Sequence, residues 1–211
     1  MNEELVRRAA LGPGMAVLDV GCGIGGTLAA IGADFARTGL NIGDDQLAVA
    51  RRSVPDVNWV HGDAMAMPFD DGSFDRILCI EAAFHFPSRR GFFEEAARVL
   101  RPGGRLVMSD LLVGAGGPPD LVALVTSGLG PWPDPYGSEG PLEQIASGLD
   151  LEVEDVTALV APSFAVLMGE EAVADPLICA DGGDRGTAAL GSLCAGGWLS
   201  IVYATGQLKT P

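Results

Sequence analysis

The sequence lacks the features that would carry the chain into or through a membrane. No apolar run reaches the roughly 20 residues that a membrane-spanning helix needs. The first residues, MNEELVRRAAL, lack the apolar core of a secretion signal. The four cysteines, at positions 22, 79, 179 and 194, form neither a CxxC pair nor a zinc-like spacing. We therefore expect a reduced, cytoplasmic protein with no metal site and no membrane partner.

Positive charge is also scarce. The chain has 13 Lys and Arg residues against 28 Asp and Glu residues, which gives a formal net charge of −15. Such a surface repels nucleic acids and anionic membranes unless basic residues gather in one place. The pairs Arg51-Arg52 and Arg89-Arg90 are isolated. We expect no nucleic-acid partner.

The length and composition are typical of one globular domain. The chain has 211 residues, 48% of them hydrophobic, with a mean hydropathy of +0.29. That length is sufficient for one complete core, and no internal repeat or long break divides it. We predict a single domain over residues 1–211.

The stretch 16–27, AVLDVGCGIGGT, predicts a buried strand, a glycine loop and a helix. Glycines at alternate positions, here Gly21, Gly23 and Gly25, let the backbone approach a ligand closely. Their spacing fits the pyrophosphate fingerprint of dinucleotide sites poorly. Asp19 beside the loop would repel a phosphate but suits an ammonium group. Without a ligand the stretch is a tight strand-to-helix turn, so its neighbours must decide.

The rest of the chain alternates strands with helices. Four strand–loop–helix steps in succession imply right-handed crossovers. We predict an α/β, Rossmann-like fold: one open, mostly parallel sheet of seven strands with helices on both faces. The expected strands are residues 17–20, 39–42, 57–61, 76–80, 105–112, 151–159 and 198–205. The expected helices are residues 3–11, 27–37, 45–53, 88–100, 121–129, 141–148, 162–174 and 187–195.

Polar or glycine-rich segments follow the first five predicted strands. Ligands in open α/β sheets bind outside the carboxyl ends of the strands, so these segments should converge on one crevice. Each of them alone is explained by turn capping or core packing, but five together predict a ligand site. The segments are Asp19 with the glycine loop, residues 41–46, residues 63–65, residues 81–86, and Asp110.

Five motifs in this order carry a family resemblance: DVGCGIGG, GLNIGDDQLAVAR, GDAMAMPFDDGSFD, IEAAFHFP and EEAARVLRPGGRLVMSD. Together they resemble class I S-adenosylmethionine-dependent methyltransferases, in the branch that methylates sugars, macrolides, sterols and other natural products. The resemblance covers residues 4–113, whereas residues 114–211 match only in general layout. It implies a cofactor-binding half, 1–113, and an acceptor-side half, 114–211, with a loop at 114–140.

The resemblance implies a binding site for S-adenosyl-L-methionine. It places Asp19 near the ammonium group of the cofactor and Asp63 near the adenine amino group. The family usually has an acidic residue for the ribose at the position of Asn41, and Gln46 matches a glutamine that takes part of this role. The full implied set is Asp19, Gly21, Cys22, Gly23, Gly25, Asn41, Ile42, Gln46, Gly62, Asp63, Ala64, Met65, Glu81 and Ala82.

His85 and Asp110 are the predicted catalytic residues. Methyl transfer to a hydroxyl needs a base, and His85 matches the position where relatives place one. Asp110 matches an acidic residue that some relatives pair with the histidine. A structural role remains open for both, as a histidine packed between aromatic residues and as a loop cap. The acceptor should be a small, natural-product-like molecule, methylated at oxygen, bound between residues 84–85, Asp110 and the loop holding Trp132 and Tyr136.

Some features depart from the family or favour other functions. Relatives carry a few dozen residues before the first strand that form a lid, whereas this chain has about fifteen. A partner subunit of a homodimer, the mobile loop holding WPDPY or the acceptor itself would then cover the cofactor, or the site is unusually open. A catalytically silent binding module and an N- or C-methyltransferase remain alternatives. A nicotinamide oxidoreductase is disfavoured by the glycine spacing, and an amide methyltransferase by the absence of an Asn/Asp-Pro-Pro-aromatic motif.

Overall fold

The computed structural model describes residues 2–161 and 182–209, and two compact units divide the chain. Unit 1 comprises Met1–Asp110, Glu139–Val153 and Tyr203–Pro211, and unit 2 comprises Leu111–Ser138 and Glu154–Val202. All residues of the predicted cofactor site, together with His85 and Asp110, belong to unit 1. The proposed halves 1–113 and 114–211 remain a prediction.

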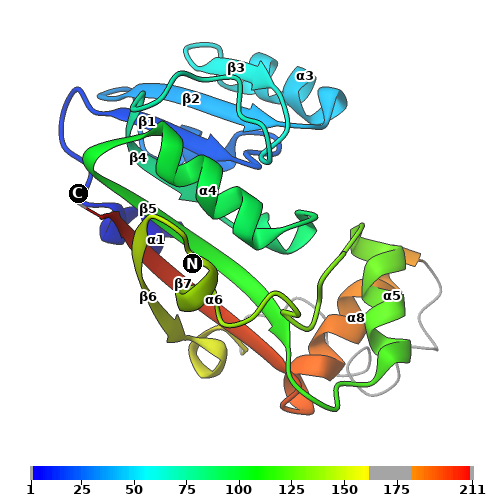
Figure 1. The fold of residues 1–211 in the computed structure, drawn as a ribbon. Helices are drawn as coiled ribbons and strands as arrows, with labels where there is room; N and C mark the ends of the chain where they lie inside the picture. The colour runs from blue at the N-terminus through cyan, green and yellow to red at the C-terminus, as the bar shows by residue number, and fades with distance from the viewer. Residues whose placement is uncertain (1, 162–181, 210–211) are drawn as a thin grey trace. The chain divides into compact units, whose positions relative to one another are not determined.

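The elements follow the predicted alternation of strands and helices (Figure 1). The strands are β1 (Ala16–Val20), β2 (Ala36–Asn41), β3 (Asn58–His61), β4 (Phe74–Cys79), β5 (Leu100–Val113), β6 (Leu149–Asp155) and β7 (Leu199–Leu208). The helices are α1 (Asn2–Ala9), α2 (Gly26–Ala30), α3 (Asp44–Ser53), the 3-10 turn η1 (Ala83–His85), α4 (Arg89–Val99), α5 (Pro119–Leu129), α6 (Leu142–Ile145) and α8 (Gly182–Ala195).

One open sheet of seven strands has the order β3-β2-β1-β4-β5-β7-β6, which confirms the predicted fold class. The pairs β1–β2, β2–β3, β1–β4 and β4–β5 are all parallel. Asp19 on β1 lies opposite Gly39 on β2 and Leu78 on β4. Because the strands are parallel and in this register, their carboxyl ends meet at one edge of the sheet.

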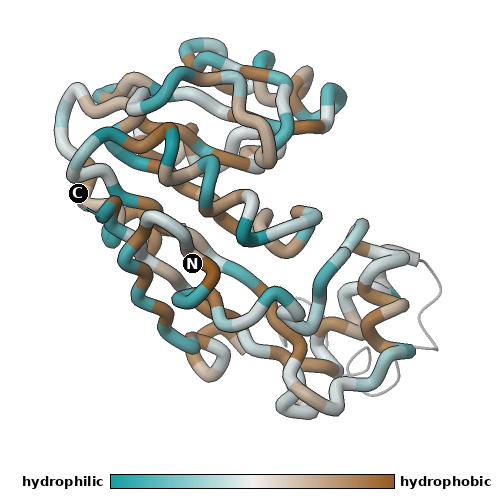
Figure 2. The backbone as a smooth tube through the Cα atoms, in the orientation of Figure 1, coloured by the Kyte–Doolittle hydropathy of each residue, from teal (hydrophilic) through white to brown (hydrophobic). Residues whose placement is uncertain are grey.

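The packing of α4 shows how the sequence builds the helical layer. Its buried residues recur at helical spacing, while the opposite face is polar, so brown and teal alternate along it in Figure 2. The side chain of Ser88 caps its first turn by accepting a hydrogen bond from the backbone N–H of Gly91. The buried set is Arg89, Phe92, Phe93, Ala96 and Val99.

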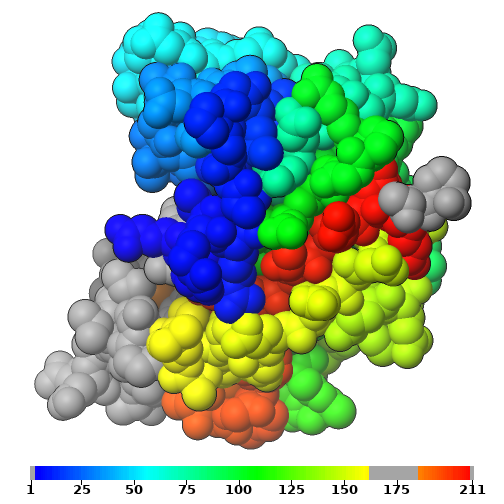
Figure 3. Space-filling model, turned by 90° about the vertical axis from the view of Figure 1, so that its left-hand side faces the viewer, coloured from blue at the N-terminus to red at the C-terminus, as the bar shows by residue number. Residues whose placement is uncertain are grey.

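Helix α1 is attached where β4 and β5 enter the sheet. Leu5 and Ala9 are fully buried. Arg76 on β4 donates to the carbonyl of Ala9 at 2.6 Å, and Arg105 on β5 donates to the carbonyl of Arg8 at 3.0 Å. In Figure 3 the dark-blue N-terminal segment lies beside the green start of β5. These arginines precede the carboxyl ends of their strands, so they attach the C-terminal end of α1 away from the edge that carries the predicted site.

The predicted helix at 27–37 is too long, because α2 ends at Ala30 and β2 already begins at Ala36. Gly32 has φ 81°, a left-handed conformation that ends the helix. Ala36 then pairs with Ala16 on β1, and its N–H donates to the carbonyl of Met15 at 3.0 Å. Pairing with β1 therefore extends the strand over residues that local periodicity had assigned to a helix.

The other predicted helix and strand boundaries differ less from the observed ones. The predicted helix 141–148 shrinks to α6, and β5 begins at Leu100, before the predicted Pro-Gly-Gly turn. Gly103 has φ 78°, and the register with β4 shifts between Phe74 and Arg76, so the turn forms an irregularity within the strand. The predicted helix 187–195 falls within α8, and the predicted helix 162–174 lies outside the described residues.

Unit 2 contains α5 and α8, which pack side by side (Figure 1). A Cβ on Gly186 would lie 2.8 Å from the Cα of Gly128, so the two backbones approach closely at this point. Among the described residues, no helix has the length and apolarity needed to cross a membrane.

Candidate active site

The glycine loop after β1 is shaped by its neighbours. Gly21, Gly23 and Gly25 have φ values of 72°, 53° and 88°. A Cβ on Gly21 would lie 2.4 Å from the Cβ of Ala82, and a Cβ on Gly25 would lie 2.5 Å from the ring of Trp59. A Cβ on Gly23 would meet no atom within 4 Å. The outer glycines thus allow close packing, and the middle one faces open space where a ligand could approach.

Asp19 is buried at the end of β1, directly before this loop. Its side chain is 1% exposed, and Oδ2 has no hydrogen-bond partner in the structure. Burial raises the pKa of Asp19 to about 7. The neighbouring Cys22 thiol has its pKa raised to about 12, first by burial and then by the charge of Asp19. A buried carboxylate oxygen without a partner is costly unless a ligand supplies a donor, and an ammonium group would do so.

At the end of β2, Asn41 and Gln46 form an amide pair. The Nδ2 of Asn41 donates to Oε1 of Gln46 at 2.8 Å and to the carbonyl of Gly43 at 3.3 Å. These bonds direct the donor of Asn41 into the loop and leave its carbonyl oxygen and the amide nitrogen of Gln46 for other contacts. Ile42 between them is 69% exposed, which suits an apolar contact with a ligand.

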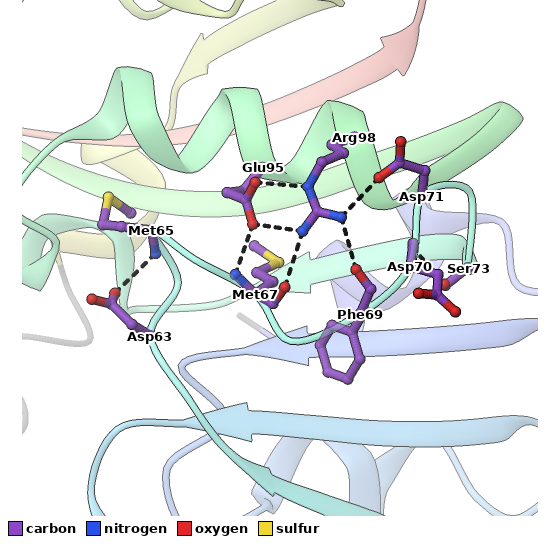
Figure 4. Close-up of polar contacts among 9 residues, drawn as sticks. All are labelled: Asp63, Met65, Met67, Phe69, Asp70, Asp71, Ser73, Glu95 and Arg98. Carbon is purple, nitrogen blue, oxygen red and sulfur yellow. Dashed lines mark hydrogen bonds and ion pairs between the residues drawn. The ribbon is translucent and has the colours of Figure 1, made fainter.

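The loop after β3 is fixed to α4 by Arg98 (Figure 4). Its guanidinium donates to Asp71, to Glu95 and to the carbonyls of Met67 and Phe69, over distances of 2.7 to 3.0 Å. Glu95 in turn accepts from the N–H of Met67 at 2.7 Å.

This anchored loop begins at Gly62 and Asp63. Asp63 Oδ1 accepts from the N–H of Met65 at 2.9 Å, so one carboxylate oxygen closes a local turn. The other oxygen points away from this bond in Figure 4. Ala64 is buried, whereas Met65 is half-buried. The loop therefore presents a carboxylate and a thioether at the same edge of the sheet, as the predicted adenine site requires.

Glu81 follows β4 and has a positive φ of 56°, unusual for a residue with a side chain. Its N–H donates to Oγ of Ser109 on β5 at 2.9 Å. The next residue, Ala82, contacts Gly21 of the glycine loop. Glu81 therefore lies beside the loop that follows Asp19. Glu81 is an exposed residue, and partial desolvation of its carboxylate raises its pKa.

His85 and Asp110 occupy different environments. His85 closes η1 and is half-buried, and its ring lies 4.1 Å from the ring of Phe84, centre to centre. Asp110 is fully buried and accepts two hydrogen bonds from Arg89, at 2.5 Å to Oδ2 and 3.2 Å to Oδ1. Arg89 is itself 1% exposed. The action of Asp110 through His85 stays a prediction, and the ion pair shows that Asp110 holds α4 to β5.

Sequence reasoning missed Arg89 and Arg98. Arg89 was interpreted as half of an isolated arginine pair, and nothing in its local pattern indicates a buried partner 21 residues away. A signal did exist for Arg98, because Glu95 precedes it at helical i, i+3 spacing. That spacing predicts their ion pair but not the loop carbonyls that Arg98 also binds.

Comparison with known proteins gives matches over the region that contains the predicted cofactor site. The model of a methyltransferase domain matches residues 18–108. The chain is 38% identical to methyltransferase GfsG of Streptomyces halstedii over 201 residues, covering 82% of this chain and 70% of the relative. The chain belongs to the methyltransferase family. Members of this family use S-adenosylmethionine and act on small molecules.

Other methyltransferases match over shorter lengths. An O-methyltransferase of Pyrenophora dematioidea is 39% identical over 132 residues, covering 58% of this chain and 49% of the relative. A sterol 24-C-methyltransferase of Gibberella zeae matches over 47% of this chain. The structure of Haemonchus contortus phosphoethanolamine N-methyltransferase 2 with S-adenosyl-L-methionine has a TM-score of 0.79 at 21% identity, covering 99% of this chain and 52% of that one. This methyltransferase chain thus spans about half, or less, of the length of several relatives.

Two further features of the methyltransferase involve residues other than the strand ends described above. Trp132 and Tyr136, predicted to line the acceptor pocket, belong to unit 2, where Tyr136 donates to the carbonyl of Gly117 at 3.3 Å. A cavity of about 600 Å³ in unit 1 is lined by Arg105, Lys209 and residues of β6 and β7. That cavity includes none of the predicted site residues.

Proposed function

We propose that this methyltransferase transfers the methyl group of S-adenosylmethionine to a small organic acceptor, most favourably to a hydroxyl oxygen. The observation that supports this most strongly is the partnerless Oδ2 of buried Asp19 next to the glycine loop. An ammonium group at this position would supply the missing donor and compensate the buried charge. The open space at Gly23 gives such a ligand a route to the backbone.

Each strand end would bind a different part of the cofactor. Asp19 and the glycine loop would hold the methionine part, and the Asn41–Gln46 pair would face the ribose. Asn41 has an oxygen acceptor to offer and Gln46 a nitrogen donor, which matches a diol in which each hydroxyl both donates and accepts. Asp63 has a carboxylate oxygen for the adenine amino group, with Met65 against the ring.

The cofactor supplies a methyl group activated by its positive sulfur. Transfer forms a carbon–oxygen bond to the acceptor as the carbon–sulfur bond breaks, so the acceptor must be aligned and must lose its proton. In our proposal His85, on η1 beside the glycine loop, takes that proton. Arg89 and Asp110 hold the start of α4, four residues beyond His85, against β5 and so limit the movement of η1.

Binding of the demethylated product, S-adenosylhomocysteine, tests the cofactor site by isothermal titration. We expect a single site in the wild type and loss of most of the binding heat in Asp19→Asn. Asp34→Asn, an exposed change of the same chemistry, is the matched control and should bind like the wild type. A wild-type protein that binds neither cofactor nor product would overturn the proposal.

The base is tested by comparing His85→Ala with His61→Ala on an acceptor found by screening hydroxylated natural products. His61 lies on β3, half-exposed, with Nε2 3.1 Å from the carbonyl of Ile42. We expect His85→Ala to lower kcat by 100-fold or more, and His61→Ala to change it little. Equal activity of His85→Ala and the wild type from pH 6 to 9 would assign His85 a structural role.

A transfer to carbon or nitrogen is the second candidate, since the curated relatives include sterol 24-C-methyltransferases. Such an acceptor would make the reaction less dependent on His85.

The proposed homodimer or loop that covers the cofactor is tested by sedimentation with and without S-adenosylhomocysteine. A protein that stays monomeric with and without this ligand would exclude the dimer.

A further inference from the structure

The indole of Trp59 occupies space that two glycines leave free. Trp59 on β3 is in register with Gly39 on β2, and Gly39 is in register with Asp19 on β1. A Cβ on Gly39 would lie 2.4 Å from the six-membered ring of Trp59, and a Cβ on Gly25 would lie 2.5 Å from the same ring. The indole therefore crosses β2 and reaches the glycine loop that follows β1.

Contacts hold the indole of Trp59 on both of its rings. The Nε1 of the five-membered ring donates to the carbonyl of Val54, the residue that follows α3, at 2.9 Å. The six-membered ring packs on Gly25, whose N–H donates to the carbonyl of Cys22 at 2.9 Å and closes the turn that contains Gly23. One rigid side chain thus joins the end of α3 to this turn.

The two halves of the glycine loop are supported in different ways. In the first half, the N–H groups of Gly21 and Cys22 donate to the carbonyl of Leu40 on β2 at 2.8 and 3.1 Å. The second half, residues 23–25, faces open space at its first residue, exposes 58% of its second, and rests on the indole at its third. The position of the second half therefore depends on Trp59.

We propose that Trp59 is a positioning residue of the cofactor site, because its indole sets the place of the turn at Gly25 and so the place at which Gly23 meets the ligand. This rests on the proposed function, since it requires the cofactor to contact the glycine loop. A loop that is already held in its bound conformation does not have to be ordered on binding. Removal of the indole should therefore weaken cofactor binding, although Trp59 is not among the residues of the predicted cofactor site.

Titration of S-adenosylhomocysteine into folded variants, well below their melting temperatures, tests the proposal. We expect Trp59→Leu to weaken binding by about 10-fold, and Trp59→Phe, which keeps an aromatic ring, by about threefold or less. Trp198→Leu is the matched control, because Trp198 is also half-buried and packs on a glycine, Gly196, but belongs to unit 2. This control should bind like the wild type even where it melts at a lower temperature.

The contact between the indole and β2 is tested by Gly39→Ala, alone and combined with Trp59→Leu. The added methyl group would meet the indole, so Gly39→Ala alone should displace the ring and weaken binding. In Trp59→Leu the same methyl group has room, so the weakening caused by Gly39→Ala should be at least about fivefold smaller there than in the wild type. Equal effects of Gly39→Ala in both backgrounds would show that the indole does not place the loop and would overturn the proposal.

The remaining outcomes separate this proposal from the proposed function. Wild-type affinity of Trp59→Leu, or an equal loss of affinity in Trp198→Leu, would overturn the positioning role and leave the proposed function intact. Absence of binding to the wild type would instead refute the proposed function itself. With an acceptor in hand, Trp59→Leu should raise the KM for S-adenosylmethionine and leave kcat near that of the wild type, whereas a lower kcat at unchanged KM would contradict a role in placing the cofactor loop.

Discussion

Binding of a cation at the end of β1 should expel a proton from Asp19. Burial raises the pKa of this carboxyl to about 7, and Oδ2 has no partner to oppose the shift. When an ammonium group pairs with the carboxylate, its pKa should fall well below neutrality. The expected release is therefore about half a proton at pH 7, about nine-tenths at pH 6 and about one-tenth at pH 8.

Calorimetry in two buffers of different ionisation enthalpy measures this release directly. The binding heat of S-adenosylhomocysteine should change with the buffer in proportion to the protons released at each pH. Asp34→Asn should show the same pH dependence as the wild type, and Asp19→Asn should lose it along with most of the affinity. A release that does not vary from pH 6 to 8, or an uptake of protons, would refute the argument that buried Asp19 receives the cation.

Three further predictions concern stability. Asp19 holds its proton more tightly in the folded chain, with a pKa of about 7 against an ordinary value of 3.8, so the unliganded wild type should lose stability as pH rises from about 4 to 7. The loss relative to Asp19→Asn should be on the order of 4 kcal/mol in urea unfolding, and equal pH slopes of the two proteins would contradict it. Asp110→Asn should cost about 3–5 kcal/mol, because it removes the negative charge that opposes buried Arg89. Arg89→Met combined with Asp110→Leu should recover most of this cost, and a cost below about 1 kcal/mol would show that the pair is solvated. Gly21→Ala should destabilise the protein by about 1–3 kcal/mol more than Gly14→Ala, because both have a positive φ but only Gly21 meets another side chain, and equal effects in thermal melts would refute that contact.

The parallel core of the sheet could be predicted because its signals are local. The apolar run of β1, the glycines after it and the almost wholly apolar β4 each indicate their structure within a few residues. The helix predicted at 27–37 was too long because strand pairing decides the end of that segment. Residues 36–38 continue β2 since β1 offers them an open edge in register, and only Gly32 marks the end of α2 in the sequence.

The features of the site also separate into those that local sequence patterns predict and those that only the folded chain reveals. Asp19 and the glycine loop could be found from spacing, as they follow one strand. The orientation of Asp110 toward Arg89 could not, because two charged residues 21 positions apart carry no sign that they meet in the core. The positive φ of Glu81 was equally hidden, since it results from Ser109 and the glycine loop and not from the residue itself.

The account depends most directly on whether a methyl group is transferred. Incubation of the wild type with S-adenosylmethionine and a panel of hydroxylated natural products, followed by mass spectrometry, measures S-adenosylhomocysteine and methylated acceptor together. We predict at least one acceptor that gains a methyl group in a one-to-one ratio with S-adenosylhomocysteine formed. Tight binding of S-adenosylmethionine with no turnover of alcohols, amines or activated carbons would contradict the account and identify the chain as a binding module.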